Sequence, residues 1–261
     1  MLHELKGLNM AKIVNCTECL KNKLYKIYKK TLAFTLAETL IVMGVIGVVA
    51  ALTLPNLNSS TGNKEKVAKV KKIYQNLNDA YGRATAVYGP MDEWGFTSGD
   101  YEANAKKAGD RITEFMKISK NCGIEKNKGC FTNGSMKFNN GNNFSSDFDT
   151  SSTKYKFILS DGTAIILAGD NVGKSFSIYI DIDGPNKGAY ILGKDVFVFY
   201  LRTDNEQGII PGTTAQYPSD SEVLNDCKTK GLNCSIWIIE KGNMDYLKCP
   251  NKLSETVTSC N

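Results

Sequence analysis

Residues 32–54 decide how this chain is interpreted, and their sequence is LAFTLAETLIVMGVIGVVAALTL. Glu38 is the one charged residue of this segment. The 24 residues from Phe34 to Leu57 are enough, as a helix, to cross a hydrocarbon core that needs roughly 20 residues. Five lysines lie just before the segment, between residues 21 and 30. A basic flank followed by an apolar run predicts an export signal or a membrane anchor.

The charge of Glu38 argues against an ordinary cleaved signal peptide. A carboxylate costs on the order of 2.5–3.5 kcal/mol at the centre of a bilayer and less near its edge, and such residues are usually functional. A signal peptide cut after the small residues around Val49 and Ala51 would gain nothing from it. Two alternatives stay open at this point: such a signal peptide, and a glutamate that only snorkels to the headgroups.

The stretch Leu32–Leu40 resembles the prepilin peptidase site of type IV pilins and type II secretion pseudopilins. In that family a small residue precedes the cut, an aromatic residue follows it and is N-methylated, and a glutamate stands fifth in the mature chain. The resemblance implies cleavage between Ala33 and Phe34, methylation of the Phe34 amine, and Glu38 as the fifth residue. Ala33 stands where the family usually has glycine.

The same resemblance implies what the chain does. Gly47 and Pro55 fall where pilin helices commonly carry helix-loosening residues. The implied protein is not an enzyme but a structural subunit whose partners are prepilin peptidase, other pilin or pseudopilin subunits and the inner membrane. It would be an inner-membrane single-pass protein with a periplasmic head, and then part of a type IV pilus, a type II secretion pseudopilus or the cell surface. Glu38 would pair with the N-terminal amine of a neighbouring subunit in the assembled core.

A second class of function keeps the same processing: a membrane-anchored surface adhesin or ligand-binding protein that does not form the bulk of a fibre. Charge and histidine content narrow the choice further. Residues 1–33 carry seven lysines and two glutamates, and the remaining 228 residues balance 25 basic against 25 acidic groups, so no nucleic-acid partner is expected. His3 is the one histidine, which removes most hydrolases and zinc enzymes. A signal-anchored enzyme that uses paired carboxylates such as Asp181 and Asp183 stays open as a third class.

The expected fold class is α+β, with a long N-terminal helix packed on a small antiparallel-sheet head. Residues 1–33 form the leader that is removed, 34–57 the membrane-spanning and assembly helix, 58–90 its amphipathic second half, and 91–261 the head with a disulfide-rich C-terminal region. The second half shows apolar residues at three- and four-residue steps, with lysines and Glu65 on the other face. These apolar positions are Val67, Val70, Ile73, Tyr74, Leu77, Tyr81, Ala84 and Val87.

Within the head, 91–132 predicts a loop and then a helix whose apolar face holds Ile112, Phe115, Met116 and Ile118. Residues 133–152 are rich in Asn, Gly and Ser and predict a surface loop. The predicted strands are Lys154–Leu159, Thr163–Leu167, Ser175–Ile182, Val196–Leu201 and, in the turn-rich last part, Cys234–Glu240. Asp161-Gly162 predicts the hairpin turn between the first two strands.

The eight cysteines divide into two groups. Cys16 and Cys19 form a CxxC in the leader, where no second pair completes a metal site. The other six suit disulfides in an oxidising compartment and allow fifteen pairings, with buried free thiols as the alternative. Short-range pairing is the simplest expectation: Cys122 with Cys130, Cys227 with Cys234, and Cys249 with Cys260.

One acidic turn, Asp181-Ile182-Asp183-Gly184, follows a predicted strand. It lacks the spacing of an EF-hand, but it resembles the acidic loop in which some major pseudopilins hold calcium. Asp181 and Asp183 are therefore candidate calcium ligands, with Asn186, Asp195 and backbone carbonyls to complete the shell. The alternative is a plain Asx-rich β-turn. No other cofactor is expected.

Overall fold

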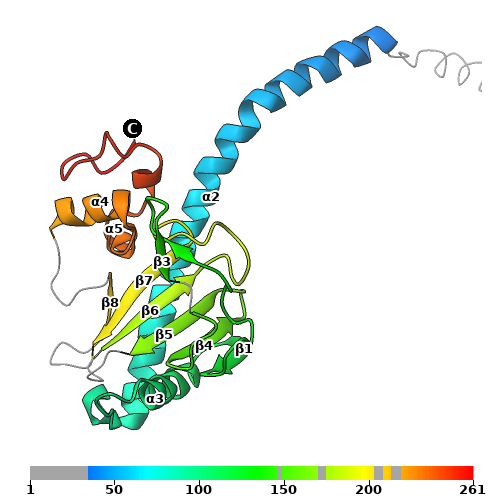
Figure 1. Cartoon of the computed structure of the whole chain (residues 1–261). Coiled ribbons are helices and arrows are strands. Elements are labelled where there is room, and N and C mark those ends of the chain that lie inside the picture. The colour runs from blue at the N-terminus through cyan, green and yellow to red at the C-terminus, as the bar shows by residue number, and fades with distance from the viewer. Residues whose placement is uncertain (1–34, 146–147, 170–174, 203–207, 213–218, 261) are drawn as a thin grey trace, which may run out of the picture. The chain divides into compact units, whose positions relative to one another are not determined.

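The computed structural model describes residues 35–145, 148–169, 175–202, 208–212 and 219–260, with the side chains of 50–61 left out (Figure 1). The expected leader, including the Ala33–Phe34 junction, lies outside the described residues. The chain divides into two compact units, Met1–Asn58 and Ser59–Asn261.

Helix α2 spans Leu36–Tyr88, so the helical backbone continues through both Gly47 and Pro55. The backbone therefore stays helical after Pro55, although a proline inside a helix removes one backbone hydrogen bond. Among the residues whose side chains the structure describes, no helix is both long enough and apolar enough to span a bilayer.

In the unit Ser59–Asn261, α2 buries one apolar stripe against an antiparallel sheet. Val70, Ile73 and Leu77 are fully buried, whereas Val87 is 61% exposed, so the stripe ends before the last turn of the helix. Seven of the eight apolar positions expected from the sequence therefore belong to the core or its margin, and one does not. The stripe is buried because its period matches the helical repeat, which keeps its members on one side.

The sheet has six antiparallel strands in the order β1-β4-β5-β6-β7-β8 (Figure 1). Their bounds are β1 Ile118–Gly123, β4 Lys154–Leu159, β5 Ala164–Gly169, β6 Ser175–Asp181, β7 Val196–Arg202 and β8 Gly208–Pro211. Alternate residues such as Ile165, Ile178 and Phe199 belong to the same core cluster as the α2 stripe. The α+β class predicted from the sequence is confirmed, and β4 to β7 match the four predicted strands closely.

The predicted helix of 91–132 is shorter than expected. After the 3-10 helix η1 (Met91–Trp94), helix α3 covers Tyr101–Thr113, and Ile118 already belongs to β1. Phe115 and Met116 lie between the two elements and are half-buried. The expectation that all four apolar residues share one helix face was wrong, because three of them lie beyond the helix end.

The predicted strand Cys234–Glu240 was also wrong, because these residues form helix α5 (Cys234–Lys241). Asn233 precedes the helix, and Gly242 ends it in the left-handed conformation at φ 71°. Helix α4 (Asp220–Thr229) comes before it and begins with a capping box in which Ser219 and Glu222 bond reciprocally. The short 3-10 helix η2 (Asp245–Leu247) follows α5.

The expected surface loop 133–152 contains a second, two-stranded sheet of β2 (Met136–Lys137) and β3 (Asn143–Ser145). This small sheet belongs to a separate apolar cluster that includes the buried Phe131, Met136 and Phe148. The sequence did not predict these buried apolar residues, because they are widely spaced in an Asn- and Gly-rich stretch and show no periodicity.

Candidate assembly helix and acidic turn

The first turn of α2 is closed by Thr35 and Glu38. Glu38 Oε2 accepts hydrogen bonds from the Thr35 backbone N–H and from Thr35 Oγ1, both at 2.9 Å. In return the Glu38 N–H donates to Thr35 Oγ1 at 3.2 Å. This reciprocal pair is a capping box, and it places a negative charge at the positive end of the helix dipole. The residues Thr35-Leu36-Ala37-Glu38 have the spacing of a capping box. This pattern was not used to predict where the helix begins.

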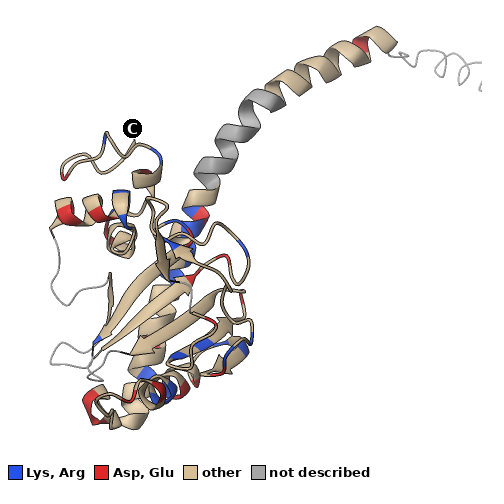
Figure 2. Cartoon of the chain, in the orientation of Figure 1, with Lys and Arg blue, Asp and Glu red and all other residues tan. Residues whose placement is uncertain are grey.

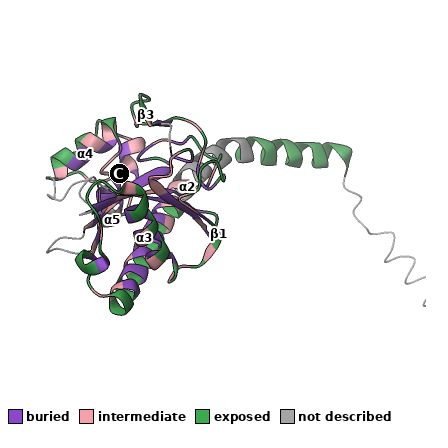
Figure 3. Cartoon of the chain, turned by 60° about the horizontal axis from the view of Figure 1, so that its bottom comes forward, coloured by how far each residue is buried: buried purple, intermediate pink, exposed green. Residues whose placement is uncertain are grey.

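Beyond the cap, every residue of the helix up to Val49 is exposed (Figure 3), and most of these residues are apolar. Figure 2 shows its described turns before residue 50 without charge apart from one acidic position. Nine large apolar side chains are 51–81% exposed, namely Leu36, Leu40, Ile41, Val42, Met43, Val45, Ile46, Val48 and Val49. A helix that is apolar all round is normally buried, and covering one such side chain is worth about 1.5–3 kcal/mol. This surface is therefore the strongest candidate for a contact with other molecules.

Of the other residues expected in this segment, Gly47 lies in the exposed part of the helix, and a side chain added there would meet nothing within 4 Å. Pro55 lies inside α2, among the residues whose side chains are not described. Ala33 and Phe34 are outside the described residues, so cleavage and methylation stay predictions.

The acidic turn after β6 is bridged by a lysine from α2. Lys66 Nζ lies 2.6 Å from Asp195 Oδ1, 3.3 Å from Asp183 Oδ2 and 3.3 Å from the carbonyl oxygen of Lys194. Lys69 donates to the carbonyl of Ile182 at 2.5 Å, one helical turn further along. Burial alone would lower the pKa of Lys66, but the hydrogen bond and charge of Asp195 and the charge of Asp183 raise it overall.

Asp181 lies at the buried base of the turn, with its side chain fully covered. Its Oδ1 accepts the N–H groups of Asp183 at 3.2 Å and Gly184 at 3.1 Å, as in an Asx turn. Burial raises the pKa of Asp181 to about 7; these two hydrogen bonds act against the shift, and the charges of Asp183 and Asp195 add to it.

The carboxylates of the acidic turn are arranged around a lysine ammonium and not as the expected calcium shell. Within the described residues, no group of three or more acidic, histidine or cysteine side chains is arranged to hold a metal ion. Asp183 and Asp195 converge on Lys66, while Asp181 bonds the backbone of its own turn. Calcium binding by Asp181 and Asp183 thus stays a prediction without support from this geometry. Sequence reasoning placed Lys66 on the solvent face of its helix, and no local signal links it to a turn more than a hundred residues away.

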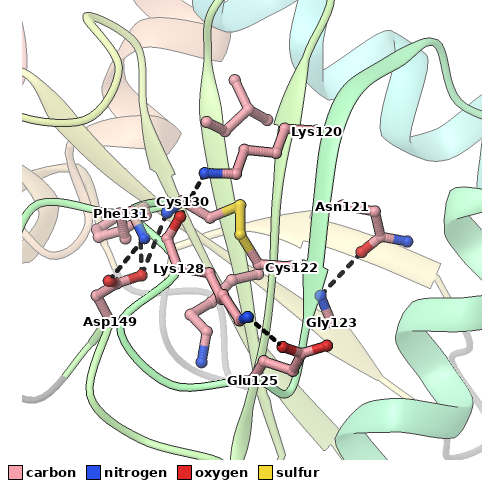
Figure 4. Close-up of a disulfide and its surroundings, with 12 residues drawn as sticks. Lys120, Asn121, Cys122, Gly123, Glu125, Lys128, Cys130, Phe131 and Asp149 are labelled. Atoms are coloured by element: carbon pink, nitrogen blue, oxygen red, sulfur yellow. Dashed lines mark hydrogen bonds and ion pairs between the residues drawn. A yellow bond between two sulfur atoms is a disulfide. The ribbon is translucent and has the colours of Figure 1, made fainter.

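All six cysteines beyond the apolar segment form disulfides, so the disulfide prediction is confirmed. The pairs are Cys122–Cys130, Cys227–Cys234 and Cys249–Cys260, with Cα–Cα distances of 6.2, 5.0 and 5.9 Å. Figure 4 shows the first pair beside Asp149, a buried carboxylate that the sequence analysis did not single out. Asp149 accepts the successive N–H groups of Gly129, Cys130 and Phe131 at 3.0–3.3 Å, which holds the cross-linked loop in place.

Comparisons with protein-family models, with curated proteins and with solved structures found no match to this chain. Any functional assignment therefore rests on the residues and the geometry described above.

Proposed function

We propose that the chain is a pilin-like structural subunit, cut by prepilin peptidase between Ala33 and Phe34 and assembled through its N-terminal helix. The observation that carries the proposal is the helix start: a Thr35–Glu38 cap followed by nine exposed apolar side chains. Such a surface is stable only when lipid or other helices cover it. In this proposal the apolar segment lies in the inner membrane first and in a helical filament core afterwards.

The position of Glu38 supports assembly over simple anchoring. Cleavage at Ala33 would leave the positive amine of Phe34 at the tip of an apolar helix, four residues before Glu38. In a filament core, the carboxylate of one subunit and the amine of the next can neutralise each other. Two opposite charges in an apolar setting are far less costly as a pair than alone.

The head region fits a periplasmic or surface location in this proposal. Three disulfides are typical of chains that fold in an oxidising compartment. The partners proposed are prepilin peptidase, the inner membrane and other pilin or pseudopilin subunits, in a type IV pilus or a type II secretion pseudopilus.

The proposal is tested by shearing the surface of cells that express the chain and identifying the recovered filaments. We expect filaments in which this chain is the main component or a regular minor one. Recovery of the processed chain in membranes alone, with no filament containing it, would instead favour the membrane-anchored adhesin or ligand-binding protein.

A further inference from the structure

The turn between β6 and β7 places two carboxylates beside α2, one nearly buried and one, that of Asp183, 31% exposed. Asp195 is 2% exposed. Its Oδ2 accepts the N–H of Ala189 at 2.7 Å, and its Oδ1 faces Lys66 Nζ at 2.6 Å. The Asp183 carboxylate and the Lys194 carbonyl face the same nitrogen, each at 3.3 Å. Three oxygens from one turn therefore converge on a single cation, and that cation is a side chain of α2.

The backbone of the turn holds these oxygens in place. Gly188 has φ 69°, and a side chain added there would lie 2.6 Å from Asp183 Oδ2 and 3.3 Å from the carboxyl carbon of Asp195. The chain thus closes tightly over both carboxylates. A lysine ammonium offers three donors on a compact charge, which matches three converging acceptors.

We propose that Lys66 is a built-in counter-ion that fastens the β6–β7 turn to α2 and makes the unit Ser59–Asn261 independent of divalent cations. The lysine ammonium is part of the chain and therefore always present at the turn, whereas the occupancy of a metal site depends on the metal concentration in the medium. Removal of the ammonium leaves the nearly buried Asp195 charge without compensation. The oxygens that remain are the type that calcium prefers, so a chain without this lysine acquires a requirement for calcium.

The test compares Lys66→Met with Lys64→Met in the full chain, purified in detergent. Both changes remove one positive charge from α2, but Lys64 is exposed, which makes it the matched control. Melting temperatures are measured in excess calcium and in excess chelator. The wild-type and Lys64→Met chains should melt at the same temperature in both conditions. Lys66→Met should melt about 4–8 °C lower in chelator and recover most of that loss in calcium.

A second variant assigns the ligands of the acquired site. Lys66→Met combined with Asp195→Asn should lose the response to calcium, because the most buried of the converging charges is gone. If Lys66→Met does not accumulate in folded form, Lys66→Gln removes the charge and keeps a donor of nearly the same reach. Calcium titration of the wild-type chain by calorimetry adds a measurement that needs no variant, and no binding heat is expected.

Three results would overturn the proposal: calcium binding or stabilisation of the wild-type chain, a Lys66→Met chain as stable in chelator as Lys64→Met, or a destabilised Lys66→Met chain that calcium does not restore. None of them depends on whether the chain forms filaments. The proposal and the proposed function therefore fail separately.

Discussion

Glu38 has two candidate roles at the residue scale, helix cap and charge partner, and only the second requires its negative charge. As a helix cap, Glu38 needs only an acceptor oxygen, and capping contributes about 0.5–2 kcal/mol to helix stability. As a partner for a neighbouring amine, it needs its charge. Both bonds from Thr35 end on the same oxygen, Oε2, so the cap and an ion pair are geometrically compatible.

Three substitutions test this distinction by the yield of sheared filaments. Glu38→Gln keeps an acceptor for the capping box but removes the charge, and we expect a strong loss of filaments because breaking a buried pair costs ~3–5 kcal/mol. Glu38→Ala should be at least as defective. Thr35→Val removes the hydroxyl and leaves the charge, so its yield should stay near wild type. Normal yield from Glu38→Gln would show that the glutamate is only a cap.

Asp181 predicts a pH dependence of stability. Its pKa is about 7 in the folded chain and about 3.9 in an unfolded one, so the folded chain holds the proton more tightly. The favourable contribution is complete below about pH 4 and is lost as the pH rises through about 7. Asp181→Asn keeps an acceptor for the Asp183 and Gly184 N–H groups without the charge. We expect the Asp181→Asn chain to be as stable as the wild-type chain near pH 4. At pH 8 its free energy of unfolding should be higher than that of wild type, by on the order of 2–4 kcal/mol.

Melting curves of both chains at the two pH values measure the effect. An equal difference between Asp181→Asn and wild type at pH 4 and at pH 8 would contradict a raised pKa for this carboxyl.

At the scale of elements, sequence patterns were sufficient where burial follows a simple period. Strands β4 to β7 are short stretches rich in aliphatic and aromatic residues and bounded by turns, and Asp161-Gly162 marks the hairpin between the first two. The pattern failed for Cys234–Lys241, where β-branched and aromatic residues suggested a strand. Its fully buried Trp237 and Ile238 belong to the core as a helix face, and tertiary packing outweighs the weak local preference.

Gly109 allows helix α3 to pack closely against Tyr155 of β4. A side chain at Gly109 would lie 2.1 Å from Cγ of Tyr155, whose ring is buried under the helix. Gly109→Ala should therefore lower the melting temperature by about 3–10 °C, as expected for overpacking of about 1–3 kcal/mol. Gly82→Ala is the control, because that exposed position of α2 has nothing within 4 Å and alanine favours helices there. Equal effects of the two changes would contradict the close contact.

At the scale of the whole molecule, the chain combines an apolar helix start with a disulfide-linked α+β unit. The sequence was sufficient for the class of fold, the six paired cysteines and the unusual apolar segment with its glutamate. It was not sufficient for the Lys66 bridge. Lys66 and Asp195 are 129 positions apart, and only the folded sheet brings the turn to the helix. Long-range charge pairs of this kind leave no periodic trace.

Mass spectrometry of the N-terminal peptide, taken from the chain recovered from cells, is the decisive test of the pilin-like assignment. Processing at a prepilin-type site predicts a chain that begins at Phe34 with one added methyl group on its amine. The apolar segment would then remain attached to the head. A chain that begins near Leu52 would show an ordinary signal-peptidase cut, and a chain that still carries residues before Phe34 would show no prepilin-type cleavage. Either result would contradict the pilin-like assignment.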